Sequence, residues 1–148
     1  MASTVEEPAV ASVHPVRGRA DVVVARRAAQ RLGLRVGLSQ RHATEIAIVV
    51  SELATNIVKY GVRGEVAFTW LPGMPGTFTV VAKDVGPPIH DLESALADGC
   101  DDRGPIDPAL LPGRGGLGSG LGAVVRLADR FECRQDAGGK EITVRFFR

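Results

Sequence analysis

The sequence is poor in cysteine, in uncompensated charge and in long apolar runs, and each shortage argues against a class of protein. Only two of the 148 residues are cysteines, Cys100 and Cys133, and they do not form a C-x-x-C pair, so neither a disulfide scaffold nor a structural zinc site is expected. The net charge of +1 argues against a nucleic-acid binder driven by electrostatics. The longest apolar run, from Ile46 to Val50, is far below the roughly 18 residues that span a bilayer. The N-terminal residues lack the apolar stretch of a secretory signal, and we expect a cytoplasmic protein without nucleic-acid or membrane partners.

The composition is that of a globular domain with an excess of glycine. Apolar residues make up 45% and charged residues 24% of the chain, which favours a packed core over disorder. Its length fits one domain, and we expect a flexible tail at residues 1–11 followed by a domain at residues 12–148. The 18 glycines exceed the usual share, and many of them lie near the C-terminal third.

Apolar periodicity and capping residues predict an α+β fold. We expect a first helix from an N-cap at Asp21 to a stop at Gly33, and a second, longer one from an N-cap at Ser39 to Gly61. Strands are expected at 9–16, 65–71, 77–83, 130–135 and 141–147, and further helices at 91–97 and 121–129, around a Pro- and Gly-rich loop at 86–116. This order predicts a two-layer sandwich, with about three helices on one face of a mixed, mostly antiparallel sheet.

The long helix carries a polar row beside its buried stripe. One sector of the helix carries four polar residues, which are Glu45, Glu52, Asn56 and Lys59. A solvated helix flank is the more common explanation of such a row. Asn56 is evidence against this explanation and favours a functional role for the row, because asparagine is a poor residue for a helix interior. Its amide oxygen could bind a hard cation, beside the Glu52 carboxylate acting as a base.

Two further segments could carry chemistry. Asp84 follows a predicted strand and precedes Gly86; it is either a plain turn residue or a carboxylate fixed to accept a hydrogen bond from an exocyclic amine. The glycine-rich run at 113–122 leads into a helix, so it is either a linker or a loop whose backbone amides hold an anion. It is not a P-loop, because the only Gly-Lys pair is followed by Glu141, and no strand precedes it as a dinucleotide fingerprint requires.

Together these segments resemble the three motifs of the GHKL superfamily of ATPases and kinases, in order and spacing. Residues 52–56 (ELATN) resemble its N box, residues 84–86 (DVG) its first glycine box and residues 116–121 (GLGSGL) its second. Within the superfamily the chain is most similar to the small bacterial anti-sigma-factor kinases, and among these to the switch kinases of the stressosome. The resemblance implies a Bergerat-type ATP-binding fold over about residues 12–148.

The resemblance also implies roles for individual residues. Asn56 would coordinate Mg²⁺ on the phosphates of ATP, and Glu52 would be the general base. Asp84 would receive the adenine amine, and Gly86 would let the base approach. The remaining nucleotide-binding residues would be Lys59 and, in the second glycine box, Gly116, Leu117, Gly118, Ser119, Gly120 and Leu121.

The implied activity is that of an ATP- and Mg²⁺-dependent serine/threonine protein kinase. Its partner would be a STAS-domain antagonist or scaffold, with a phosphatase or a sigma factor as a further partner. The chain departs from the family pattern at Pro88, where a glycine is usual, and at Lys140, where a threonine is usual. The segment between Gly99 and Gly115, which would form the lid over the nucleotide, is also longer than in the family. These departures favour the alternative, a weak or inactive nucleotide-binding module that acts on a partner. A free-standing ATPase is a third alternative.

Overall fold

Five strands form the main sheet of this computed structural model, which describes residues 10–87, 100–101, 104–105 and 120–148. The strands follow the order β1-β2-β3-β7-β6, and all four neighbouring pairs are antiparallel. The last strand in the chain therefore lies inside the sheet, between β3 and β6. The strands are β1 (Val10–Val16), β2 (Gly64–Leu71), β3 (Thr77–Asp84), β6 (Arg130–Asp136) and β7 (Gly139–Phe147).

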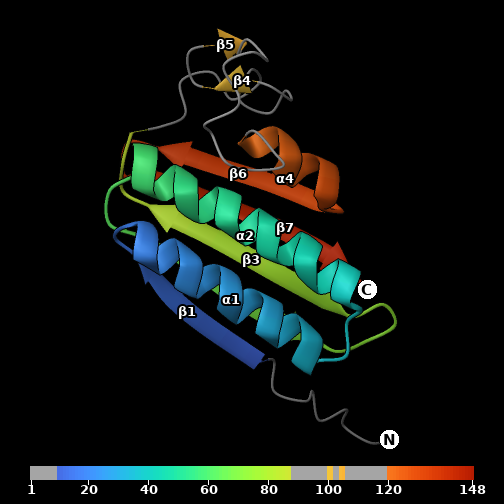
Figure 1. Cartoon of the computed structure of the whole chain (residues 1–148). Coiled ribbons are helices and arrows are strands. Elements are labelled where there is room, and N and C mark those ends of the chain that lie inside the picture. Colours follow the sequence, from blue (N-terminus) through green and yellow to red (C-terminus); the bar gives the residue numbers. More distant parts are fainter. Residues whose placement is uncertain (1–9, 88–99, 102–103, 106–119) are drawn as a thin grey trace, which may run out of the picture.

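Within the described residues, three helices cover one face of this sheet (Figure 1): α1 (Arg19–Arg35), α2 (Gln40–Tyr60) and α4 (Leu121–Leu127). The predicted α+β class and the presence of these three helices are confirmed. A small pair of strands, β4 (Cys100–Asp101) and β5 (Gly104–Pro105), was not predicted. The helix expected at 91–97 and the first nine residues of the expected tail lie outside the described residues.

The core lies between the two layers. Alternate residues of β2, β3 and β7 face the helices, and the fully buried Phe68, Phe78 and Phe146 fill the centre of this face. The apolar stripe of α2 packs against them, and its buried residues are Ala43, Ile46, Ala47, Val49, Val50, Leu53, Ala54 and Ile57. This is the stripe that the helical periodicity predicted.

Both predicted ends of α1 are wrong. The helix begins at Arg19, two residues before the expected N-cap, and Asp21 lies in its first turn, where its carboxylate accepts a hydrogen bond from the backbone amide of Arg17 at 2.8 Å. Gly33 does not stop the helix, because its role is close packing. A methyl group at Gly33 would lie 3.2 Å from the Cβ of Ala43 on α2. The chain turns instead at Gly37, which has a positive φ of 94°.

Both predicted ends of α2 are confirmed. The Ser39 hydroxyl accepts a hydrogen bond from the backbone amide of His42 at 3.1 Å and caps the helix. The helix ends at Tyr60, and the backbone amide of Gly61 bonds the carbonyl of Ile57 at 2.9 Å. These two ends fix the position of the polar row along the helix.

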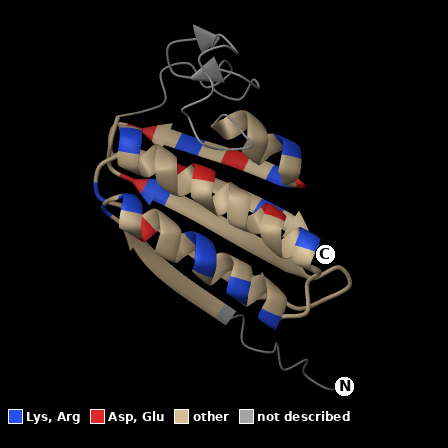
Figure 2. Ribbon diagram, in the orientation of Figure 1, with Lys and Arg blue, Asp and Glu red and all other residues tan. Residues whose placement is uncertain are grey.

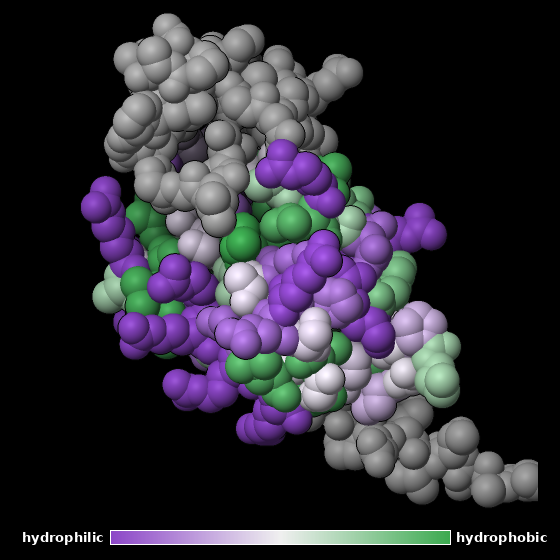
Figure 3. Space-filling view, turned by 45° about the vertical axis from the view of Figure 1, so that its right-hand side comes forward, coloured by the Kyte–Doolittle hydropathy of each residue, from purple (hydrophilic) through white to green (hydrophobic). Residues whose placement is uncertain are grey.

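The outer face of α1 is basic. Arg26, Arg27, Arg31 and Arg35 are exposed, and Asp21 is the only acidic residue of the helix (Figure 2). On the side of the molecule seen in Figure 3, hydrophilic and hydrophobic side chains are interspersed. Over the described part of the chain, no helix combines the length and the apolar character needed to cross a membrane.

Candidate functional site

Asp84 lies where β3 ends, on the helix-covered face of the sheet, and the end of α2 packs directly against it. A methyl group at Gly61 would lie 2.8 Å from Asp84 Cγ, and one at Gly86 would lie 2.9 Å from Gly61 Cα. The backbone amide of Val85 also bonds the carbonyl of Val62 at 2.9 Å. Larger residues at these two glycines would separate the segments, so glycine is needed to keep the first glycine box against the end of the N-box helix.

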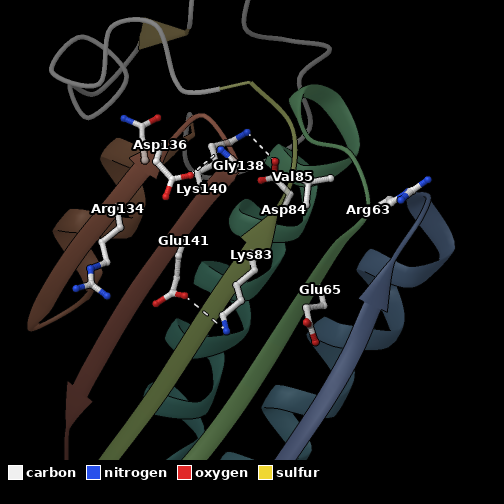
Figure 4. A pocket seen from close by; sticks show the side chains of 12 residues that line it. Arg63, Glu65, Lys83, Asp84, Val85, Arg134, Asp136, Gly138, Lys140 and Glu141 are labelled. Carbon is white, nitrogen blue, oxygen red and sulfur yellow. Dashed lines mark hydrogen bonds and ion pairs between the residues drawn. The ribbon is translucent and has the colours of Figure 1, made fainter.

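The Asp84 carboxylate forms a buried ion pair with Lys140 (Figure 4). Lys140 Nζ lies 2.9 Å from Asp84 Oδ1, and each side chain is only 5% exposed. The same oxygen accepts the backbone amide of Gly86 at 2.8 Å, and Lys140 also donates to the carbonyl of Pro87 at 2.8 Å. Lys140 therefore links the end of β3 to the chain segment that follows it.

Sequence reasoning treated Lys140 only as the loss of a hydroxyl and missed this ion pair. A signal was present in the strand alternation. Lys140 is two residues before Ile142, and Asp84 is two residues after Ala82, and both of these apolar residues are buried. Period-two alternation therefore places both charges on the core face, and the register pairs them directly.

Glu52 connects the N box to the beginning of α4. Burial raises the pKa of its carboxyl group above the usual 4.5, while a hydrogen bond from the Gly120 backbone and the positive charge of Lys59 lower it. Gly120 is the N-cap of α4, with φ 64° and ψ −142°, and Leu121 after it is buried. Glu52, the predicted general base, therefore lies against Gly120, the last glycine of the second glycine box.

The other residues of the polar row have different surroundings. Glu45 binds Arg41 at 3.2 Å and Arg148 at 3.5 Å, which is a structural role. Asn56 is half-buried, one turn after Glu52, and Lys59 is exposed. The predicted nucleotide-binding residues Gly116, Leu117, Gly118 and Ser119 lie outside the described residues, as does Pro88.

The donor chemistry at Asn56 and Glu52 fits a magnesium ion that arrives with a nucleotide. Among the residues that the structure describes, no group of three or more His, Cys, Asp and Glu side chains could hold a metal by itself. Mg²⁺ in nucleotide sites commonly uses one or two protein oxygens, and phosphates and waters complete its shell. The Asn56 amide oxygen, beside a carboxylate, can supply such a ligand.

A cavity of about 640 Å³ opens at the same end of the sheet (Figure 4). Asp84 and Lys140 belong to its lining, together with charged residues such as Arg63, Lys83 and Glu141. Glu52 and Asn56 do not line it. The side chains of Lys83 and Glu141 alternate with those of Asp84 and Lys140, which face the helices. The cavity therefore opens on the uncovered face of the sheet, and it does not join Asp84 to Glu52 and Asn56.

Comparison with known proteins agrees with this arrangement. Residues 18–146 match the model of the histidine kinase-like ATPase domain. The chain is 32% identical over 125 residues to the serine/threonine-protein kinase RsbT of Bacillus subtilis (strain 168), a match covering 82% of this chain and 85% of RsbT. The chain therefore belongs to the histidine kinase-like ATPase family, also called GHKL. Within that family it belongs with the anti-sigma-factor kinases of the RsbT type, which confirms the resemblance seen in its motifs.

A solved structure shows the same fold. The RsbU and RsbW domains of Rv1364c from Mycobacterium tuberculosis superpose with a TM-score of 0.62 at 15% identity. The match covers 95% of this chain and 32% of that longer one. At this identity the likeness concerns the fold alone.

Proposed function

We propose that this chain is an ATP- and Mg²⁺-dependent serine/threonine protein kinase of the partner-switching type. The single observation that carries the proposal is the packing of the end of α2 against Asp84 and Gly86, because it joins the N-box helix to the first glycine box. The relative RsbT is named a serine/threonine-protein kinase, and the family to which the chain belongs is one of ATPase domains.

In this proposal each site residue acts on one part of the reaction. Asn56 would hold the Mg²⁺ ion, which neutralises charge on the phosphates. Asp84 would accept the adenine amine, and Gly120 would contribute to phosphate binding. Glu52 would take the proton of the acceptor hydroxyl as it attacks the γ-phosphate. A pKa raised by burial suits this role, because a general base works best when its pKa approaches the working pH.

The proposed acceptor is a serine or threonine on a STAS-domain antagonist or scaffold protein in the cytoplasm. Phosphorylation would release a partner and thereby regulate a sigma factor or a phosphatase, as in a stressosome. The basic outer face of α1 offers charges for a protein partner.

The ion pair of Lys140 favours a second candidate function. Lys140 already binds one oxygen of the Asp84 carboxylate, the group that would bind the adenine ring. If this pairing weakens nucleotide binding, the chain acts as a partner-binding module with little or no catalysis. The two functions differ in whether phosphate is transferred.

Phosphate transfer from labelled ATP to a purified STAS-domain protein tests the proposal. Glu52→Gln should slow transfer by about 100-fold or more, since it removes the base while keeping the shape of the side chain. Glu45→Gln is the matched control, because it changes the same row two turns earlier, and it should keep the rate within a few-fold. Equal rates in wild type and Glu52→Gln would remove Glu52 from the mechanism. Partner binding without any transfer by the wild type would favour the second function.

A further inference from the structure

The uncovered face of the sheet, opposite the face on which the described helices lie, carries charges in a regular order across its strands (Figure 1). Near the end of the sheet that holds Asp84, the strand register brings four charged side chains of this face into one row, which lies side by side in Figure 4. From β2 to β6 the row reads Glu65, Lys83, Glu141 and Arg134. Its charges therefore alternate, from negative on β2 to positive on β6.

A second, shorter row beside it also changes sign across the sheet. Arg63 directly precedes β2, and Asp136 ends β6. Val85 follows β3 and Gly139 begins β7, so the two central positions of this row are uncharged. All four residues line the cavity on this face. The strands β2 and β6, which lie on either side of the central pair β3–β7, therefore carry opposite charges in both rows.

This order makes the face complementary to a second copy of itself. Sheets that pack face to face keep their strand directions within about 30° of each other. A two-fold axis that runs along the strands, between β3 and β7, sets β3 opposite β7 of the second copy and β2 opposite β6. The facing pairs across the two copies are then Glu65 with Arg134, Lys83 with Glu141, and Arg63 with Asp136. Every charge of the two rows meets an opposite charge.

The rest of the face fits the same symmetry. Val81 on β3 would face Thr143 on β7, and the partly exposed Phe147 would face Thr77. The other charged residues of the face meet uncharged ones, in the pairs Arg145 with Thr79, Arg130 with Thr69, and Glu132 with Ala67. Small and β-branched side chains allow the usual sheet separation of about 10 Å. The cavity at the charged rows leaves room for the longer side chains of the second copy.

The charges also select the orientation of the two copies. A two-fold axis at right angles to the strands, in the plane between the sheets, would place each residue of a row opposite itself. Glu65 would then face Glu65, and Arg134 would face Arg134 of the second copy. Like charges in contact disfavour that arrangement, so the rows permit one orientation and reject the other.

We propose that this chain forms a two-fold symmetric dimer through the uncovered face of its sheet, and that the two charged rows determine the orientation of the copies. Five strands of about seven residues present roughly 500 Å² on this face, below the about 800 Å² per partner of a standard interface. The dimer is therefore weak and depends on protein concentration. The helix-covered faces point away from each other, so both copies keep Glu52 and Asp84 outside the interface.

Sedimentation equilibrium of the full chain at low ionic strength, from about 5 to about 200 µM protein, tests the dimer. The average mass of the wild type should rise with concentration from that of one chain toward that of two. Arg134→Glu places two acidic residues together at both symmetric contacts with Glu65, and it should raise the dissociation constant at least about tenfold. Arg27→Glu is the matched control, because it makes the same charge change on the exposed face of α1. It should associate as the wild type does.

A charge swap separates contacts between copies from effects within one chain. Glu65→Arg combined with Arg134→Glu again sets opposite charges against each other across the axis, and it should bring the dissociation constant to within about threefold of the wild type. Within one chain the swap leaves an arginine beside Lys83 and a glutamate beside Glu141. Recovery of the dimer therefore reports the contact between copies.

Each contrary result overturns a stated part of the proposal. A wild type that stays monomeric over the whole range overturns the dimer, and this measurement needs no variant. Dimerisation that Arg134→Glu leaves unchanged overturns the interface. A loss that the charge swap does not repair overturns the facing of Glu65 and Arg134. None of these results affects the proposed kinase activity, which phosphate transfer tests separately.

Discussion

The two ends of the central strand pair β3–β7 both carry ion pairs, but in different surroundings. At one end Asp84 and Lys140 are almost fully buried, with side chains 5% exposed. At the other end Arg148 binds Asp129 at 2.8 Å and Glu45 at 3.5 Å, and these side chains are 16–38% exposed. The Arg148 guanidinium also lies 5.7 Å from the centre of the Phe146 ring.

The difference indicates what each end does. The backbone of Arg148 forms two hydrogen bonds with Gly76, and its side chain joins α2 to the segment before β6, so this end closes the sheet. At the buried end, Lys140 holds Asp84 and the carbonyl of Pro87, so this pair fixes the segment that follows β3. A buried pair adds little stability over apolar residues of the same shape, but removing one partner leaves the other charge buried and unpaired.

Breaking each ion pair in turn should give the largest contrast. Asp84→Ala leaves Lys140 charged and buried, and it should lower the free energy of unfolding by about 3–5 kcal/mol. Arg148→Ala should lower it by about 1 kcal/mol, because its partners are partly exposed. Urea unfolding measures both values. Asp84→Ala combined with Lys140→Met should recover part of the loss, and a double variant no more stable than Asp84→Ala would contradict the assignment of a buried charge.

Close packing around Asp84 should give the next largest effect. Gly139 has a φ of 143°, and a methyl group there would lie 2.2 Å from the Asp84 carbonyl oxygen. Gly139→Ala should therefore lower the free energy of unfolding by about 2 kcal/mol or more. In Gly138→Ala the added methyl group would meet only Asp136 Oδ1 at 3.2 Å, and this exposed control should change stability by about 0.5 kcal/mol or less. Equal losses of unfolding free energy in the two variants would contradict this prediction, because the backbone next to Asp84 would then adjust to the added methyl group.

The smallest effect should come from the titration of Glu52. Because burial raises its pKa in the folded chain, its contribution to stability is complete below the usual value of 4.5 and is lost as the pH rises through the folded pKa. Glu52→Gln has no carboxyl group at this position, so the variant does not lose this stability as the pH rises. The stability of the variant relative to the wild type should therefore increase from about pH 4 to about pH 7. Thermal unfolding across this range measures the trend, and a decrease would mean that hydrogen bonding outweighs burial at Glu52.

Local patterns predicted most of the fold. The Ser39 cap, the apolar stripe of α2 and the strands β2, β3, β6 and β7 each follow from a pattern among neighbours in the sequence, so they can be read directly. The start of α1 was misjudged because an acidic residue in the first turn resembles an N-cap. Gly33 was misjudged because it is needed for close packing against Ala43 on another helix. Such a contact leaves no local signal.

The candidate site was predictable in its motifs but not in its interactions. Glu52, Asn56, Asp84 and Gly120 were identified from motif spacing, and their roles stay predictions. The bond from Lys140 to Asp84 joins residues 56 positions apart, so only the strand register shows it. The contact of Glu52 with Gly120 depends on the packing of α4, which the sequence does not specify locally.

The place of β7 in the sheet also has a kinetic consequence. Among the described residues, β6 pairs with β7 alone, and β7 pairs on its other side with β3. The two last strands therefore join the earlier ones through pairs at least 56 positions apart in the sequence, such as Asp84 and Lys140. Pairings of such high sequence separation form slowly, so we expect the joining of β7 to β3 to be the late step in folding.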